Sequence, residues 1–370
     1  MAHREAAIQR AKRISLARKA RACLAIKANY LRADIARIVG KTGEYLVISN
    51  ILGAKIMAHL VESMFYAGET PWHGLGVKLD SPATSADAIR AAGLDWRVEK
   101  CPLFLADGTQ VKDAFATVRD SDFKALGVVG ARYEPLQNAQ GFEFFDSIVG
   151  EGAAVYHTAG SLCEGRKIWV LAKLPGEIVV KGNDIVDKFL LLSNSHDGSS
   201  AVQVKFTPIR VVCANTLNLA MKDGESVYNI RHTRSVSETI NKIKGLMSLA
   251  HQNFELAAPI FQQTARVQID AQQLKSFVEL VLPMPAKSDE EAEASTRLKN
   301  TRLKIIDLFE SEQTNIMPEI RGTVWAAYNA VTFYADHERG SDSKRLENAW
   351  FGQGAELKAL AFQEAMKLAA

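Results

Sequence analysis

The sequence predicts an α+β protein: an antiparallel β-meander with a short crossing helix, followed by a mostly helical C-terminal part. Two patterns support this class. Short β-favouring runs alternate with turn residues up to Phe206, and apolar residues recur every three or four positions after Ser235. The changeover falls at Lys205–Ala220. We therefore expect three parts: a basic helical leader over residues 1–56, an α+β core domain over 57–232 and a helical domain over 233–370.

Turn signals divide the core domain into strands. Asp107-Gly108 separates two apolar, β-favouring runs and is a strong hairpin signal. Further runs follow at hairpin spacing, so a meander is expected. Its turns are predicted at Pro175-Gly176, at Gly182-Asn183-Asp184 and at His196-Asp197-Gly198-Ser199. Helices are expected over Ser85–Ala92, Asn138–Val149 and Val211–Met221.

The helical part opens with Ser235-Val236-Ser237-Glu238, a capping box that satisfies two backbone N–H groups. The apolar repeat that follows predicts an amphipathic helix to about Ala265. Later helices are expected up to Glu312, over Gly322–His337 and over Ala355–Leu368.

Composition excludes several classes of protein. No run of eighteen apolar residues occurs, so no membrane span is expected, and the N-terminus lacks the apolar stretch of a secretory signal. The four cysteines are far apart and form no CxxC pair, which argues against a compact zinc site. We expect a cytoplasmic protein with reduced cysteines, no cofactor and no metal.

Charge is divided unevenly along the chain. Residues 1–56 hold 12 of the 45 Lys and Arg but 3 of the 42 Asp and Glu, which leaves the remainder with a net charge of −6. The basic character therefore belongs to the leader. This leader has three interpretations: a nucleic-acid-binding arm, a solvated helical extension, or upstream coding sequence read from too early a start, since Met57 is a plausible second beginning.

Several segments together carry a family resemblance. They are Phe65-Tyr66, Pro71-Trp72-His73-Gly74-Leu75-Gly76, Pro208–Leu217, Ala326–Val331 and Trp350-Phe351-Gly352. From about Met57 to the C-terminus the chain resembles the "phage/plasmid-like protein" family, a domain of unknown function (DUF932). The resemblance implies an association with phages, plasmids and other mobile elements, and no particular activity. Separately, a curved meander that leads into a helix is similar in architecture to single-strand annealing proteins.

The changeover holds the strongest candidate site. Between Gln203 and Gly245 there are seven Lys or Arg and three acidic residues, a positive island in an acidic body. Such an island is typical of phosphate binding, and Arg210 lies where a strand meets a predicted helix. The alternative is that Arg210 and Asn215 join helix to sheet. The candidate nucleic-acid-binding residues are Lys205, Arg210, Asn215, Thr216, Arg231, Arg234, Lys242 and Lys244.

Other candidate residues have simpler interpretations beside the functional ones. Trp72 and His73 are candidates for stacking on a base, or for a turn that packs into the core. Ser195-His196-Asp197 is better explained as a turn than as a catalytic triad, because neighbouring side chains point in different directions. Cys213 is a weak candidate nucleophile with His196 or His232, and His157 joins these two histidines in a metal site only if the fold gathers them.

Three functional hypotheses follow from these observations. The first is a non-enzymatic mobile-element protein that binds or anneals single-stranded nucleic acid as a homo-oligomer. The second is a protein-interaction module that modulates a host factor, in anti-restriction or replication control. The third, weaker hypothesis is a hydrolase that uses Cys213 or a cluster of histidines.

Overall fold

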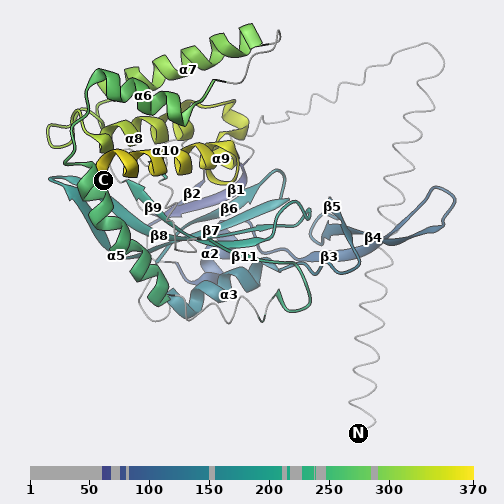
Figure 1. Ribbon diagram of the computed structural model, residues 1–370. Coiled ribbons are helices and arrows are strands. Elements are labelled where there is room, and N and C mark those ends of the chain that lie inside the picture. The colour runs from purple at the N-terminus through teal and green to yellow at the C-terminus, as the bar shows by residue number, and fades with distance from the viewer. Residues whose placement is uncertain are drawn as a thin grey trace.

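The computed structural model describes residues 61–67, 76–80, 83–149, 155–210, 215–216, 227–236, 238, 247–284 and 291–370. These residues form two β-sheets and a mostly helical C-terminal part (Figure 1), which confirms the predicted α+β class. No helix among them combines the length and the apolar character needed to cross a membrane. The leader and the side chains of Trp72, His73, Cys213, Lys242 and Lys244 lie outside the described residues.

The larger sheet has the strand order β10-β9-β8-β7-β6-β1-β2, and β11 also pairs with β9. Strands β1 and β2 run parallel, and the other neighbours are antiparallel. The strands are β1 (Val61–Ala67), β2 (Val77–Leu79), β6 (Val155–Leu162), β7 (Lys167–Lys181), β8 (Asp184–Ser195), β9 (Val202–Arg210), β10 (Asn215–Thr216) and β11 (Val227–Ile230).

Successive antiparallel pairing from β6 to β9 confirms the predicted meander, but one predicted turn is wrong. Strand β7 continues through Pro175-Gly176. The register shifts between the pairs Lys173–Phe189 and Glu177–Asp187, so the dipeptide forms a bulge. A proline without an N–H and a glycine at φ +76° suit a bulge as well as a turn. The pairing of β7 with β8 on both sides of the dipeptide makes it a bulge and not a turn.

The smaller sheet is a three-stranded antiparallel unit that projects from the body (Figure 1). It consists of β3 (Val98–Phe104), β4 (Gln110–Arg119) and β5 (Ala125–Gly130), and we call it the β-arm. The hairpin predicted at Asp107-Gly108 is confirmed, with Gly108 at φ +88°.

A second prediction fails in the larger sheet. Asn215–Thr216 forms β10, which pairs with β9 beside Arg210, so the helix predicted over Val211–Met221 is wrong at these two residues.

Helices lie on both sides of the larger sheet (Figure 1). On one side are α2 (Ser85–Ala91) and α3 (Asn138–Val149), both predicted. On the other side is a helical layer. Two of its helices, α6 and α9, were not predicted from the sequence. Its helices are α6 (Ala271–Val281), α7 (Glu291–Ser311), α8 (Val324–Phe333), the π-helix η4 (Tyr334–Glu338), α9 (Asp342–Phe351) and α10 (Gln353–Ala369), and α5 (Met247–Thr264) flanks the sheet.

Burial of both sheet faces explains the long apolar runs in the central strands. Along β7, Val170 belongs to a core cluster that includes α3, while Trp169 packs edge-on against Trp350 of α9 at 5.9 Å. The larger cluster also contains Phe261, whose ring lies 4.9 Å from Trp325. This hydrophobic core is therefore continuous across the domain boundary predicted at residue 232.

A buried ion pair connects the sheet to the helical layer. Arg210 at the end of β9 and Asp184 at the start of β8 are both fully buried. The guanidinium donates from Nε and a terminal nitrogen to the two carboxylate oxygens, at 2.7 and 2.9 Å. It also donates to the Thr314 carbonyl at 2.6 Å and to Asn315 at 3.3 Å. Trp325 of α8 donates its indole N–H to Asp184 at 2.7 Å.

We expect Arg210→Met to lower the free energy of unfolding by about 3–5 kcal/mol, because it leaves the Asp184 carboxylate buried without its countercharge. Urea titration of the full chain measures this. The control is Arg90→Ala, which removes an exposed pair with Asp87 and should change stability by about 0.5 kcal/mol or less. A loss for Arg210→Met no larger than that of the control would contradict the assigned role.

Candidate nucleic-acid interface

The two central residues of the predicted basic island point into the protein. Arg210 has no exposed surface, so its predicted contact with nucleic acid is wrong, and its structural alternative is the one observed. Lys205 donates from Nζ to the Trp350 carbonyl at 2.8 Å and lies 5.5 Å from the Phe351 ring centre. Enclosure of its ammonium group, helped by nearby Lys358, lowers the pKa of Lys205 to about 7.

The other members of the island separate into two groups. Asn215 and Thr216 form β10, and the structure describes their backbone but not their side chains. Arg231 and Arg234 are exposed and follow β11 directly. The fold therefore separates the members of the basic island into buried and exposed residues. Among its described members, Arg231 and Arg234 have charged side chains that are exposed to solvent.

Arg231 and Arg234 lie in a junction that we call the neck, defined as residues 131–134, 195–200 and 231–235. The backbone joins the first and third segments, since Glu134 N–H donates to the His232 carbonyl at 3.1 Å. The second segment packs against the β-arm, where a Cβ added at Gly127 would lie 2.5 Å from the Asp197 Cα. The neck thus lies where the β-arm meets the body.

Aromatic rings hold the neck together. Tyr133 stacks on His232 with 4.5 Å between ring centres and 21° between planes. Its hydroxyl donates to the Ser195 carbonyl at 2.8 Å, which connects the first and second segments. His232 Nδ1 contacts the Glu134 carbonyl at 3.2 Å. Burial raises the pKa of Tyr133, so the phenol stays neutral and keeps its hydrogen bond.

His196, in the second segment of the neck, is a neutral, buried residue. Its backbone N–H donates to the Arg166 carbonyl at 2.7 Å, and its Nε2 lies 2.9 Å from Asn138 Oδ1. Burial, and then the neighbouring His232, lower its pKa to about 3. Ser195 Oγ exchanges hydrogen bonds with the Ser200 backbone, at 3.0 and 2.9 Å. These partners are those of a turn, as expected, and differ from those of a catalytic relay.

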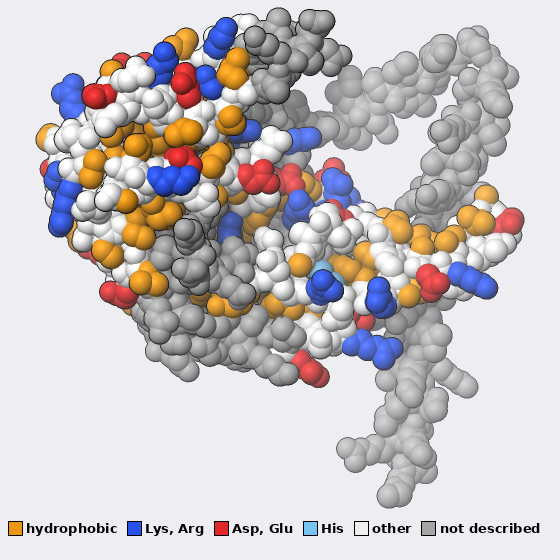
Figure 2. Space-filling model, viewed as in Figure 1, with side chains coloured by type: hydrophobic (Ala, Val, Ile, Leu, Met, Phe, Trp, Pro, Cys, Tyr) orange, Lys and Arg blue, Asp and Glu red, His pale blue; other side chains and the backbone are white. Residues whose placement is uncertain are grey.

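Charge at the neck is positive. Arg132, Arg231 and Arg234 are exposed within it, and exposed Arg166 lies beside it through its contact with His196. None of these four guanidinium groups forms an ion pair with another residue in the described ranges. The carboxylates of the neck are Glu134 and Asp197. Figure 2 shows Lys and Arg side chains beside a histidine at the base of the β-arm.

The three histidines of the hydrolase hypothesis do not form one cluster, and Cys213 lies outside the described residues. His196 and His232 are close enough to affect each other's charge, whereas His157 lies elsewhere and packs on Phe189 at 4.9 Å. Burial lowers the pKa of His157 to about 4. Burial beside Glu347 raises that of Cys163 to about 11, so this thiol stays protonated at neutral pH. Within the described part of the chain, no three His, Cys, Asp or Glu are grouped to hold a metal.

The fold and the neck define an α+β protein with a positively charged junction. The family model named "Domain of unknown function (DUF932)" matches residues 125–351. The chain belongs to this family, which confirms the DUF932 resemblance over these residues. No curated protein and no solved structure matches the chain. The matched range includes every residue of the neck.

We expect His196 to make stability depend on pH. Its pKa is about 3 in the folded protein against 6.5 when exposed, so the unfolded chain binds the proton first as pH falls. Stability from this group is complete above about pH 6.5 and is lost as the pH falls toward 3, by about 1.4 kcal/mol per pH unit in between. Urea titrations at several pH values should show a shallower dependence in His196→Gln. Equal slopes in the two proteins would contradict a neutral, buried imidazole.

Proposed function

We propose that this protein binds single-stranded nucleic acid at the neck and does not catalyse a reaction. The observation that carries the proposal is the group of four exposed arginines, none in an ion pair with another described residue, around the stacked pair Tyr133–His232. A guanidinium binds phosphate through two parallel hydrogen bonds. Each phosphate it neutralises releases counterions, which supplies affinity that does not depend on base sequence.

The hydrogen-bonding groups of the neck suit a flexible, single-stranded backbone. Ser199, Ser200, Thr233 and Ser235 are exposed there, and their hydroxyls complement the arginines at phosphate and sugar oxygens. The half-buried Tyr133 ring is held flat against His232, as an aromatic platform for a base must be. The association with phages and plasmids that the family resemblance implies agrees with this proposal.

Replacing Arg132, Arg231 and Arg234 with alanine one at a time should weaken binding to a labelled single-stranded oligonucleotide. Each change removes one phosphate contact, so the slope of log affinity against log salt should fall by about 0.7 per substitution. Fluorescence anisotropy across a salt series measures both effects.

The matched control for these variants is Lys275→Ala. Lys275 is an exposed cation on α6, in the helical layer, and it should leave affinity and slope unchanged. Equal loss in the control and in the three arginine variants would show non-specific attraction. An intact protein that binds no oligonucleotide at low salt would refute the proposal.

A second candidate function, self-association through the β-arm, rests on its exposed apolar residues. Phe104 and Leu105 are 53% and 57% exposed near the tip, and Val128 on β5 is 64% exposed. Within the described chain β3 is an edge strand, and Gln137 occupies only its first position by exchanging two hydrogen bonds with the Val98 backbone, both 2.9 Å. An edge of this kind pairs readily with its own copy.

Sedimentation velocity tests this second candidate. The double variant Phe104→Ser with Leu105→Ser should shift the protein to a smaller species, because the apolar tip no longer favours pairing of two arms. Leu280→Ser, which changes an equally exposed residue on α6, is the control. A monomeric parent protein, or a variant that sediments like the parent, would contradict self-association through the β-arm.

A further inference from the structure

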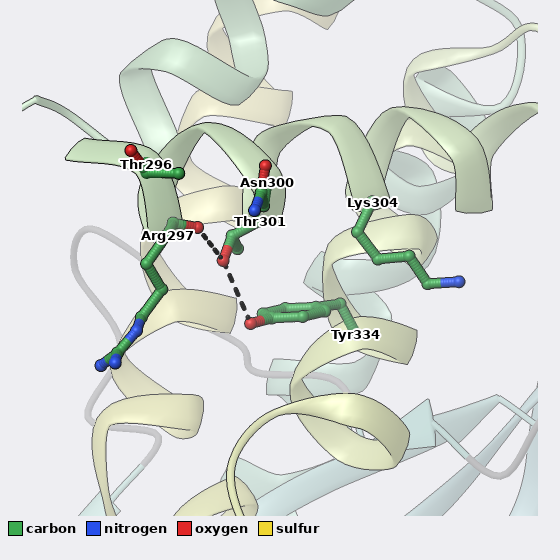
Figure 3. Close-up of a pocket in the computed structure, with 6 residues that line it drawn as sticks. All are labelled: Thr296, Arg297, Asn300, Thr301, Lys304 and Tyr334. Carbon is green, nitrogen blue, oxygen red and sulfur yellow. Dashed lines mark hydrogen bonds between the residues drawn. The ribbon is translucent and has the colours of Figure 1, made fainter. Parts of the chain in front are cut away.

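A pocket in the helical layer lies far along the chain from the neck. It has a volume of about 430 Å³ and is formed between α7 and the start of η4. We call it the α7 pocket, and its lining residues, drawn in Figure 3, are Thr296, Arg297, Asn300, Thr301, Lys304 and Tyr334. Its size is that of sites that hold small organic ligands, for which roughly 300–1,000 Å³ is usual.

The two cations of the pocket, Lys304 and Arg297, differ in their contacts with carboxylates. Lys304 Nζ lies 3.4 Å from both Asp307 and Glu338, so its charge is shared between two carboxylates. Arg297 is exposed and forms no ion pair with any side chain that the structure describes, a set that excludes residues 291–295 of α7. Among the described side chains, the pocket therefore has the Arg297 guanidinium without a carboxylate partner at one end and two carboxylates beyond the other end.

An aromatic ring and small polar groups occupy the space between these ends. Tyr334 extends beneath α7 with its hydroxyl toward Thr301 (Figure 3), at an oxygen–oxygen distance of 3.5 Å. The Thr301 hydroxyl donates to the Arg297 carbonyl at 3.0 Å, which fixes it on the pocket side of the helix. Asn300 adds an exposed amide with both donors and an acceptor.

The position of Tyr334 depends on an irregular piece of backbone. Tyr334 is the first residue of the π-helix η4, and π-helical turns occur frequently at functional sites because they cost stability. A buried ion pair supports this turn, since Lys358 Nζ of α10 donates to Asp336 at 2.6 Å and both side chains are nearly inaccessible. The irregular turn and its buried support are a second observation, independent of the pocket's lining.

We propose that the α7 pocket binds a nucleoside monophosphate, with the phosphate on Arg297, the base against Tyr334 and the sugar beside Asn300 and Thr301. The guanidinium binds the phosphate, the phenol ring stacks on the base, and the amide hydrogen-bonds the sugar hydroxyls. Arg297, which pairs with no carboxylate among the described side chains, balances one phosphate, and Asp307 and Glu338 repel further negative charge. The pocket therefore prefers a monophosphate to a triphosphate.

Titration calorimetry on the full chain tests this with adenosine monophosphate, adenosine triphosphate, adenosine and inorganic phosphate as probes. We expect saturable binding of the monophosphate and weaker binding of the other three. Arg297→Ala should weaken the monophosphate roughly tenfold by removing the charge-assisted hydrogen bonds. Lys299→Ala, an exposed neighbour on α7 outside the lining, is the control and should bind normally.

A second pair of variants keeps the test informative about the ring. Tyr334→Phe should retain monophosphate binding, whereas Tyr334→Leu should lose most of it while circular dichroism shows an intact fold. Arg297→Ala should leave oligonucleotide binding unchanged, which separates this site from the neck. Absence of saturable monophosphate binding at millimolar concentration, or equal binding by Arg297→Ala, would overturn the proposal.

Discussion

Arg210 and Asp184 form an ion pair inside the protein, and the joining of sheet to helices depends on it. The pair connects β8 with β9, receives the indole N–H of Trp325 from α8, and holds the carbonyl of Thr314 between α7 and α8. A buried pair of this kind contributes less to net stability than to a unique arrangement, because desolvation offsets much of its attraction. Its hydrogen bonds are directional, so they select one packing of the helical layer on the sheet.

This constraint also determines which basic residues reach the surface. Arg210 pairs with the buried carboxylate of Asp184, so it is not available to a phosphate group. Lys205 is also unavailable, because its ammonium group is enclosed and donates to the Trp350 carbonyl. The described members of the basic island that remain on the surface with charged side chains, Arg231 and Arg234, lie at the neck, where turns from three distant segments meet. The helical layer, once fixed on the sheet, creates the α7 pocket through η4. One set of basic residues thus holds the fold together, and a separate set is exposed to solvent.

Most of the fold was predictable because its signals are local. The hairpin at Asp107-Gly108, the meander and α3 follow from periodicity and turn residues. The bulge at Pro175-Gly176 and strand β10 were missed because cross-strand partners decide them. The candidate site was predictable only in part: Arg231 and Arg234 were named, but Arg132 and Tyr133 lie about a hundred residues away in the chain. No local pattern reveals that Tyr133 stacks on His232, since the fold alone brings them together.

Hydrogen–deuterium exchange of the full chain, with and without a single-stranded oligonucleotide, tests the central claim most directly. The account requires slower exchange in peptides that contain residues 131–134 and 231–235 when the oligonucleotide is present. It also requires no change in the end of β9 around Arg210, which is protected in both states by its buried contacts. Protection centred on β9, with the neck unaltered, would show that the basic island of the sequence is the interface after all and would contradict the account.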